Sequence, residues 1–254
     1  MSHQNLVDEI SDHRASVIAR YREFFVGKPG VWPLLVYEFG AWLARNMPGA
    51  LGYWSRNRLY AHQCGEVGQG VQWGQGISLR HAYKMRIGAN SVFDDHCMLD
   101  ARGAADGDFV IGQSVLVARS TILQTKSGFI RIGDHCTIGA LCYIGSFGGI
   151  SIGDHVGIAG HCYMGGARYE THRVDVPMKN QTKFSEGPIE IGEGCWIGAG
   201  VTILDGASIG AGSIIGAGAV IRADVPEMTI AMPQQKMIPM KRRTEDPSQE
   251  SPST

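Results

Sequence analysis

The chain has 254 residues, of which 35 are glycine, about twice the usual share of ~7%, and only 10 are proline. This composition excludes collagen, a disordered linker and a helical bundle, and hydrophobic residues, which make up 44% of the chain, supply a sizeable core. With 23 basic and 24 acidic residues the net charge is −1, so no overall field draws the chain to nucleic acid.

The first segment, residues 1–62, has a helical pattern. Apolar residues recur at helical spacing over residues 5–26, and Pro33 is expected to open a second helix that runs to about Asn46, ahead of a third. Two interpretations of this segment stay open. It is either a helical cap on the end of a solenoid or an interfacial anchor that contacts a membrane surface through residues 28–60. These residues include three tryptophans and have a local excess of three positive charges.

The second segment, residues 63–240, contains a repeat of six residues. Thirty of the 35 glycines lie between Gly65 and Gly218, and from Ile191 onward an apolar residue leads every hexad. A period of six fits neither a helix nor one continuous strand, so it indicates short strands separated by turns. Three hexads form a set, and seven sets predict an all-β solenoid of about seven triangular coils, stacked at ~4.8 Å. A glycine follows the first leading residue of each set, where a side chain would crowd the coil: Gly68, Gly88, Gly112, Gly133, Gly153, Gly192 and Gly210.

The repeat is interrupted only after the third hexad of a set. Successive sets begin 20, 24, 21, 20, 39 and 18 residues apart, so all extra residues leave the prism at one corner. The interval of 39 residues contains one long loop, residues 165–190. Loops of this length within a compact fold are usually functional, and we expect the site there.

Cysteines and histidines of the repeat have structural interpretations. Five cysteines occupy the fifth hexad position, where we expect small inward-facing side chains. No Cys-x-x-Cys pair is present, so no metal is expected and a reduced, cytoplasmic state is favoured. His96, His135 and His155 each follow an Asp and are predicted to occupy tight turns, since His tolerates positive φ.

The ends of the chain add little. Asp8 and Glu9 lie where a signal peptide needs a basic start, and no uncharged apolar stretch reaches the ~20 residues that span a bilayer. We therefore expect a cytoplasmic protein, with peripheral contact to the inner face of the membrane if the anchor interpretation holds. Residues 241–254 are polar and are predicted to be disordered.

The hexads, the loop with Asp175-Val176-Pro177 and Gln181, and the run from Ile191 to Gly198 together resemble the left-handed β-helix, hexapeptide-repeat acyltransferases. The arrangement is most similar to bacterial O-acetyltransferases that act on sugars and polysaccharides. The resemblance implies a homotrimer of left-handed parallel β-helices that binds acetyl-CoA as co-substrate between neighbouring prisms. It implies transfer of the acetyl group to a hydroxyl of a sugar, polysaccharide or lipid-linked glycan.

The same resemblance implies roles for individual residues. A loop histidine acts as general base in this family, and His172 is the candidate here, with Glu170 or Asp175 orienting its ring. The acceptor is expected at Arg168, Tyr169 and Arg173, and coenzyme A at Trp196, Ala199, Gly200, Ala217, Gly218, Arg222 and Lys236.

Two departures from the family pattern accompany these roles. Tyr169 stands where similar members commonly place the histidine, and Met232-Pro233-Gln234-Gln235-Lys236 replaces a usual Gly-Asn-Pro-Ala-Lys. These departures keep a second class of function open, a non-catalytic trimeric scaffold. A third alternative is a zinc protein like the γ-class carbonic anhydrases, with His155 and His161 as its near pair of ligands.

Overall fold

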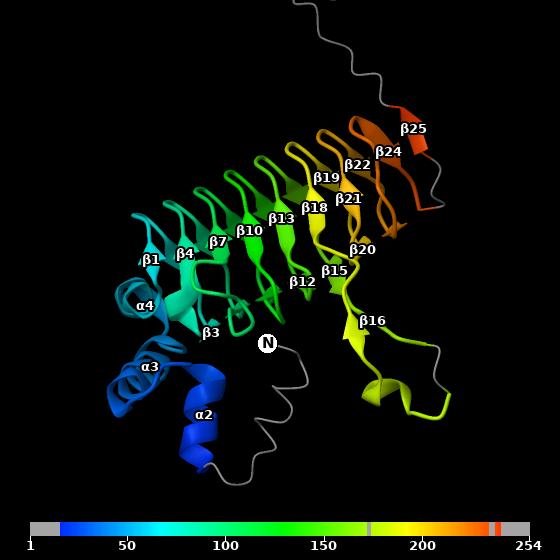
Figure 1. The fold of residues 1–254 in the computed structure, drawn as a ribbon. Helices are drawn as coiled ribbons and strands as arrows, with labels where there is room; N and C mark the ends of the chain where they lie inside the picture. The colour runs from blue at the N-terminus through cyan, green and yellow to red at the C-terminus, as the bar shows by residue number, and fades with distance from the viewer. Residues whose placement is uncertain (1–15, 172–173, 234–236, 240–254) are drawn as a thin grey trace, which may run out of the picture.

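The computed structural model of the chain describes residues 16–171, 174–233 and 237–239. Three helices precede a long prism of stacked coils (Figure 1): α2 (Val17–Phe25), α3 (Val31–Ala44) and α4 (Gly49–Gln63). The Ser16 hydroxyl caps α2 by accepting from the Ala19 N–H at 3.2 Å. The predicted helices are confirmed over these ranges, and α3 begins two residues before Pro33.

Helix α4 covers the first coil. The Tyr60 ring packs edge to face on the buried Trp73, with ring centroids 5.6 Å apart. The Arg56 guanidinium is buried beside them and donates to the carbonyls of Trp73 at 3.0 Å and Met47 at 2.7 Å. Arg56 therefore ties the helices to the coil and does not contribute to a charged surface.

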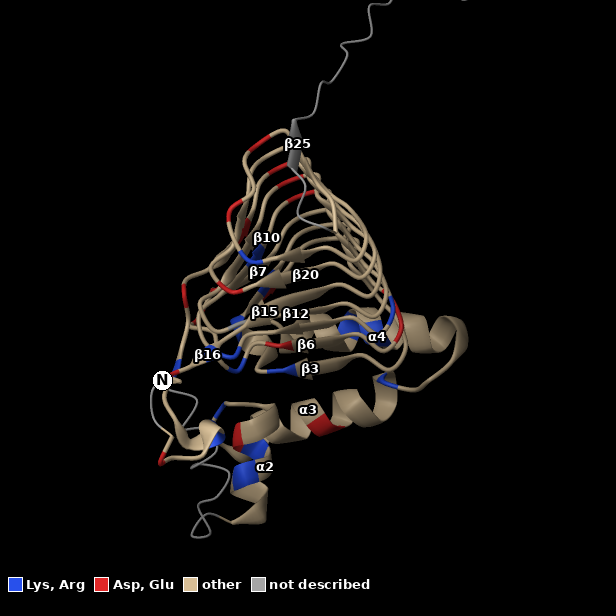
Figure 2. Ribbon diagram, turned by 90° about the vertical axis from the view of Figure 1, so that its right-hand side faces the viewer, with Lys and Arg blue, Asp and Glu red and all other residues tan. Residues whose placement is uncertain are grey.

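Three parallel sheets form the sides of the prism, and Figure 2 shows the triangular cross-section. Sheet A contains β1 (Glu66–Val67), β4 (Met85–Ile87), β7 (Phe109–Ile111), β10 (Ile130–Ile132), β13 (Ile150–Ile152), β18 (Ile189–Ile191) and β21 (Ser208–Ile209). Sheet B contains β2 (Gln72–Trp73), β5 (Val92–Phe93), β8 (Leu116–Val117), β11 (Thr137–Ile138), β14 (Gly157–Ile158), β19 (Trp196–Ile197), β22 (Ile214–Ile215), β24 (Thr229–Ala231) and the antiparallel β25 (Met237–Pro239).

Sheet C forms the third side, next to the helices. Its strands are β3 (Ser78–Arg80), β6 (Met98–Asp100), β9 (Ile122–Gln124), β12 (Tyr143–Ser146), β15 (Tyr163–Gly166), β20 (Thr202–Leu204) and β23 (Val220–Ile221). Two short 3-10 helices, η1 (Ala82–Lys84) and η2 (Met178–Asn180), and the antiparallel pair β16 (Arg168–Tyr169) and β17 (Lys183–Phe184) lie in connections.

The predicted solenoid of seven coils is confirmed. Each strand pairs in register with the equivalent strand of the next coil, as Ile130 does with Ile150 and Ile150 with Ile189. The leading residues of the hexads point inward and form one continuous apolar core. The five repeat cysteines are also buried, as predicted, and burial raises the pKa of Cys97 to about 11, so this thiol stays protonated.

The close approach of adjacent coils explains the glycine that opens each set. A Cβ on Gly153 would lie 2.7 Å from the backbone nitrogen of Glu193 on the next coil. A Cβ on Gly192 would lie 2.5 Å from that of Ala211. The glycines are therefore required by the spacing of the backbones, as the sequence predicted.

At two corners of every coil, one residue adopts the left-handed backbone conformation with positive φ. The predicted turn histidines are confirmed, since His96, His135 and His155 have φ values of 62°, 57° and 56°. His161 also has positive φ, and it lies at the corner between sheets B and C, whereas His155 lies between sheets A and B. The near pair of the zinc alternative is thus divided between two corners, and the described residues contain no group of three side chains arranged for a metal.

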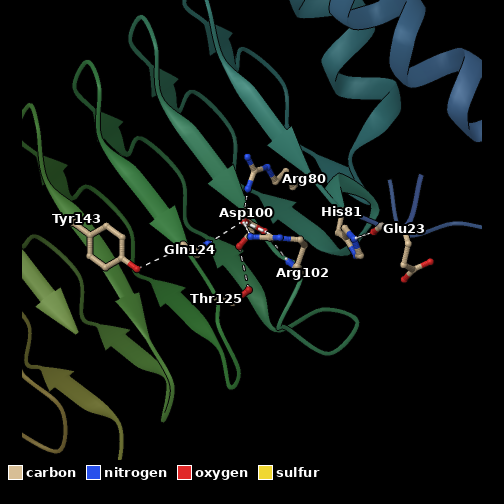
Figure 3. A network of polar contacts seen from close by, with 8 residues as sticks. All are labelled: Glu23, Arg80, His81, Asp100, Arg102, Gln124, Thr125 and Tyr143. Atoms are coloured by element: carbon tan, nitrogen blue, oxygen red, sulfur yellow. Dashed lines mark hydrogen bonds and ion pairs between the residues drawn. The ribbon is translucent and has the colours of Figure 1, made fainter. Parts of the chain in front are cut away.

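A buried carboxylate holds α2 against sheet C (Figure 3). The Asp100 side chain has no exposed surface, and it accepts from Arg102 Nη2 at 2.7 Å, Gln124 Nε2 at 3.0 Å and Arg80 Nη1 at 3.3 Å. The Arg102 and Arg80 guanidiniums lie 4.1 Å and 4.7 Å from the centroid of the Phe24 ring on α2. Asp100 therefore orients two cations that pack against the helix.

His81 makes a second contact between α2 and the coil. Its Nε2–H donates to the Glu23 carbonyl at 2.8 Å, while Nδ1 is buried and has no hydrogen-bond partner within the described residues (Figure 3). Burial, aided by the Lys84 charge, lowers the pKa of His81 below its ordinary 6.5, although the Glu23 carbonyl and the Asp100 and Glu23 charges oppose the shift. The neutral ring is therefore the form that fits the folded protein.

We expect His81 to make the protein less stable in mild acid. Its pKa is depressed in the folded state, so its contribution is complete above the unfolded pKa of ~6.5 and is lost as the pH falls below that value. Thermal unfolding of wild type and of His81→Asn, which suits the left-handed backbone, should be compared from neutral to mildly acidic pH. The melting temperature of the variant should fall less with acidification, and equal slopes would contradict the prediction.

Candidate functional site

The long loop leaves the fifth coil at the corner between sheets C and A, where all longer insertions lie. It runs from the end of β15 to the start of β18, contains β16, η2 and β17, and projects from the prism (Figure 1). Its base is the antiparallel pair of β16 and β17, in which Arg168 faces Phe184 and Tyr169 faces Lys183. The position of the loop is as the sequence predicted.

Polar contacts hold the base of the loop. Gln181 is buried, and its Nε2 donates to the Val176 carbonyl at 3.0 Å, closing the turn that contains η2. Asp205 on the next coil accepts from the Glu186 N–H at 2.6 Å, and the Glu186 carboxylate pairs with Arg168 Nη1 at 2.8 Å. Asp205 therefore fixes the C-terminal end of the loop to the next coil, and the pair of Arg168 and Glu186 joins the two strands of the loop base.

We expect Gln181→Ala to loosen this loop without unfolding the prism, since losing one buried hydrogen bond costs about 1 kcal/mol, or about fivefold in local opening. Limited proteolysis should cleave the variant within the loop faster than wild type, while the melting temperature changes little. Asn180→Ala is the matched control, because Asn180 is exposed in the same turn. Equal cleavage rates for the two variants would contradict the role of Gln181.

The predicted catalytic and acceptor residues have different surroundings. Glu170 and Asp175 are exposed, and the Glu170 N–H donates to the Thr182 carbonyl at 3.0 Å. The Lys183 Nζ lies 5.0 Å from the centroid of the Tyr169 ring, which pairs an aromatic surface with a cation at the loop base. His172 and Arg173 lie outside the described residues, so their roles stay predictions.

The predicted coenzyme A residues gather mainly at the corner between sheets B and C. The Gly218 N–H donates to the Ala199 carbonyl at 2.8 Å, which stacks the turn of Ala217 and Gly218 on that of Ala199 and Gly200. A Cβ on Gly200 or Gly218 would meet no heavy atom within 4 Å, so this corner presents exposed backbone. Lys236 lies outside the described residues.

Trp196 and Arg222 lie on the sheets that meet at this corner. The Trp196 indole is half exposed and lies on the outer face of sheet B over Gly157, where a Cβ would be 2.7 Å from its ring. Arg222 is exposed directly after β23 of sheet C. Trp196 therefore lies on the outside of sheet B, whereas Arg222 lies at the end of sheet C that is nearer the corner where the loop leaves.

One chain does not bring the two groups together. The loop leaves the corner between sheets C and A, whereas the stacked turns of residues 199–200 and 217–218 lie at the corner between sheets B and C. Sheet C separates them. A site that uses both groups needs the loop of one prism to reach the corner of a second.

Sequence reasoning missed the residues that support the site. Asp205 directly follows β20, in the segment Leu204-Asp205-Gly206, and lies at the same corner as the loop. Its position after the third hexad of a set could have indicated that it contacts the loop. Lys183 was visible only as one of several charged residues in the loop. Its approach to Tyr169 depends on the antiparallel pairing of β16 and β17, which the hexad pattern does not encode.

Comparison with known proteins agrees with this architecture. Residues 188–223 match the family of bacterial transferase hexapeptides (six repeats), and residues 129–162 match the hexapeptide repeat of succinyl-transferase. AntD, an N-acyltransferase from Bacillus cereus in complex with dTDP and 3-hydroxybutyryl-CoA, is similar over 75% of this chain and 90% of its own, with 19% identity and a TM-score of 0.52. A maltose O-acetyltransferase from Clostridium difficile 630 is similar over 83% of this chain and 88% of its own, with 22% identity and a TM-score of 0.40. No curated protein sequence matches the chain.

Both family matches fall on coils of the prism. The chain therefore carries the hexapeptide repeat of bacterial transferases on a solenoid of three parallel sheets.

Proposed function

We propose that this protein is a hexapeptide-repeat acyltransferase and, more specifically, an O-acetyltransferase, which moves an acetyl group from acetyl-CoA to a hydroxyl of a sugar, polysaccharide or lipid-linked glycan. The observation that carries the proposal is the long polar loop at the fifth coil of a hexapeptide prism, whose turn is closed by Gln181 and which Asp205 holds to the next coil. AntD, which shares the fold, is described in complex with an acyl-CoA and is an N-acyltransferase, so an amine acceptor is the alternative that a test must include.

The chemistry needs one base and no covalent intermediate. His172 takes the proton of the acceptor hydroxyl as the oxygen attacks the thioester carbonyl, and the thiol of coenzyme A leaves with a proton. An imidazole with a pKa of ~6.5 suits this transfer near neutral pH. Glu170 and Asp175 are the loop carboxylates proposed to orient the ring, and Arg168, Tyr169 and Arg173 are proposed to contact the acceptor.

The proposed assembly is a homotrimer with a site between neighbouring prisms. The loop and the corner with Ala199, Gly200, Ala217 and Gly218 lie at different edges of one chain, so a second copy is needed to join them. Trp196, Arg222 and Lys236 are also proposed to contact coenzyme A. Light scattering of the purified protein should give three times the mass of the 27.5 kDa chain.

The direct test is a screen of acyl-CoA thioesters against sugar and amino-sugar acceptors, with release of free thiol as the readout. We expect thiol release with acetyl-CoA that depends on a hydroxyl acceptor. Release only with amino acceptors would overturn O-transfer while keeping the family activity. Isothermal calorimetry decides the scaffold alternative, since a non-catalytic scaffold should bind no coenzyme A.

A further inference from the structure

The N-terminal helices expose a large aromatic surface that acyl transfer does not explain. The exposed fractions of Trp32, Trp42 and Trp54 are 75%, 80% and 64%. On α3 the exposed residues recur at spacings of three and four, which places them on one stripe: Trp32, Leu35, Phe39 and Trp42. Helix α4 adds Leu51, Tyr53 and Trp54. Exposed apolar patches of this kind mark interaction sites.

From this stripe we infer that α3 and α4 hold the protein on an anionic membrane surface. The opposite side of α3 packs on the protein, since Gly40 and Ala44 are buried, so the stripe is the side left for a partner. No described helix has both the length and the apolar character needed to cross a bilayer. The helices would lie along the interface, where Trp and Tyr rings are favoured because they have an apolar body and a polar edge.

The charges around the stripe fit an anionic surface. Among residues 28–60 the exposed basic residues are Lys28, Arg45 and Arg58, and the only acidic residue is Glu38, so three minus one leaves a charge of +2. The Glu38 carboxylate is also occupied, because it accepts from the Tyr21 hydroxyl at 2.6 Å. Each basic residue near an anionic leaflet contributes about 1 kcal/mol of attraction.

A cavity beside the stripe favours an amphiphilic lipid over a second copy of the chain. It has a volume of about 230 Å³ and lies between the start of α3 and the first coil. Its walls include Phe25, Trp32 and Tyr37, and Lys28 lies with them, its Nζ 4.7 Å from the Tyr83 ring centroid. An apolar cavity with a cation beside it suits a ligand with an apolar chain and an anionic head.

The orientation of the helices relates this surface to the proposed site. In both ribbon views, α2 and α3 extend from the prism toward the side to which the loop with β16 also projects (Figures 1 and 2). The helices lie at the first coil and the loop at the fifth, four coil spacings or about 19 Å apart. A protein held by α3 and α4 would therefore keep the loop near the membrane surface.

The test is flotation of the full chain with vesicles of mixed phosphatidylcholine and phosphatidylglycerol, compared with phosphatidylcholine alone. We expect binding to the mixed vesicles that weakens with salt. Both Trp32→Ala/Trp42→Ala and Lys28→Glu/Arg58→Glu should bind at least about tenfold more weakly. Leu116→Ala/Met228→Ala, which removes exposed apolar side chains from the prism, is the matched control and should bind like wild type.

Other results would overturn the inference. Wild type that stays with neither kind of vesicle, or the tryptophan variant that floats like wild type, would exclude the membrane role. Equal binding to phosphatidylcholine alone would remove the requirement for anionic lipid. A lower mass of the tryptophan variant by light scattering would show that the stripe joins copies of the chain. Thiol release by the unanchored variants with a soluble acceptor tests the proposed function separately.

Discussion

Asp100→Asn is expected to lower the free energy of unfolding by about 3 kcal/mol, the low end of the cost of breaking a buried ion pair. The carboxylate is fully buried and accepts from Arg80, Arg102 and Gln124, so its neutral replacement leaves two guanidiniums without their counter-charge. The effect stays at the low end because the side chains of Arg80 and Arg102 keep 20% and 11% of their surface in water. Denaturant or thermal unfolding would measure it.

The chain offers a matched control for this variant. Asp108 pairs with Arg131 at 2.7 Å, but both side chains are substantially exposed, so Asp108→Asn should cost at most about 1 kcal/mol. Asp100→Asn should also release α2, because Arg102 and Arg80 no longer hold their positions under Phe24. Earlier proteolysis between α2 and the first coil would report that release. Equal stability losses for the two variants would show that burial of Asp100 is not decisive.

His172→Ala is expected to lower the transfer rate by about 100- to 10,000-fold, the range that general base catalysis contributes. The proposed mechanism contains no other group that removes the hydroxyl proton. In wild type the rate should fall in acid, because a protonated imidazole cannot accept a proton. Steady-state thiol release with the acceptor found by the screen measures both effects.

His135→Asn is the control for this second variant. This variant also removes an imidazole, but from an exposed turn. Asparagine tolerates the positive φ of that turn, so the transfer rate should stay at the wild-type value. A folded His172→Ala protein with the full rate would assign the base to another residue. Tyr169→Phe would then test the residue that stands at the usual family position of the histidine.

The candidate site was only partly predictable. The place of the loop followed from the one interval of 39 residues, because an insertion can leave a stacked coil only at a corner. The contacts that hold the loop did not follow, because Asp205 and Glu186 meet only after the coils stack. Arg56 shows the same limit in another way, since it counts as a surface cation in the sequence but is buried beside Trp73.

The sequence by itself determined the solenoid, its seven coils and its core, because a strict period of six assigns each leading residue to the interior without any long-range information. Only the tertiary structure decided what lies on the outside of the prism. It docks α2 through Asp100 and His81, divides the proposed coenzyme A corner from the loop, and leaves Trp32 and Trp42 exposed. These outcomes depend on contacts between residues far apart in the chain, and a local repeat carries no information about them.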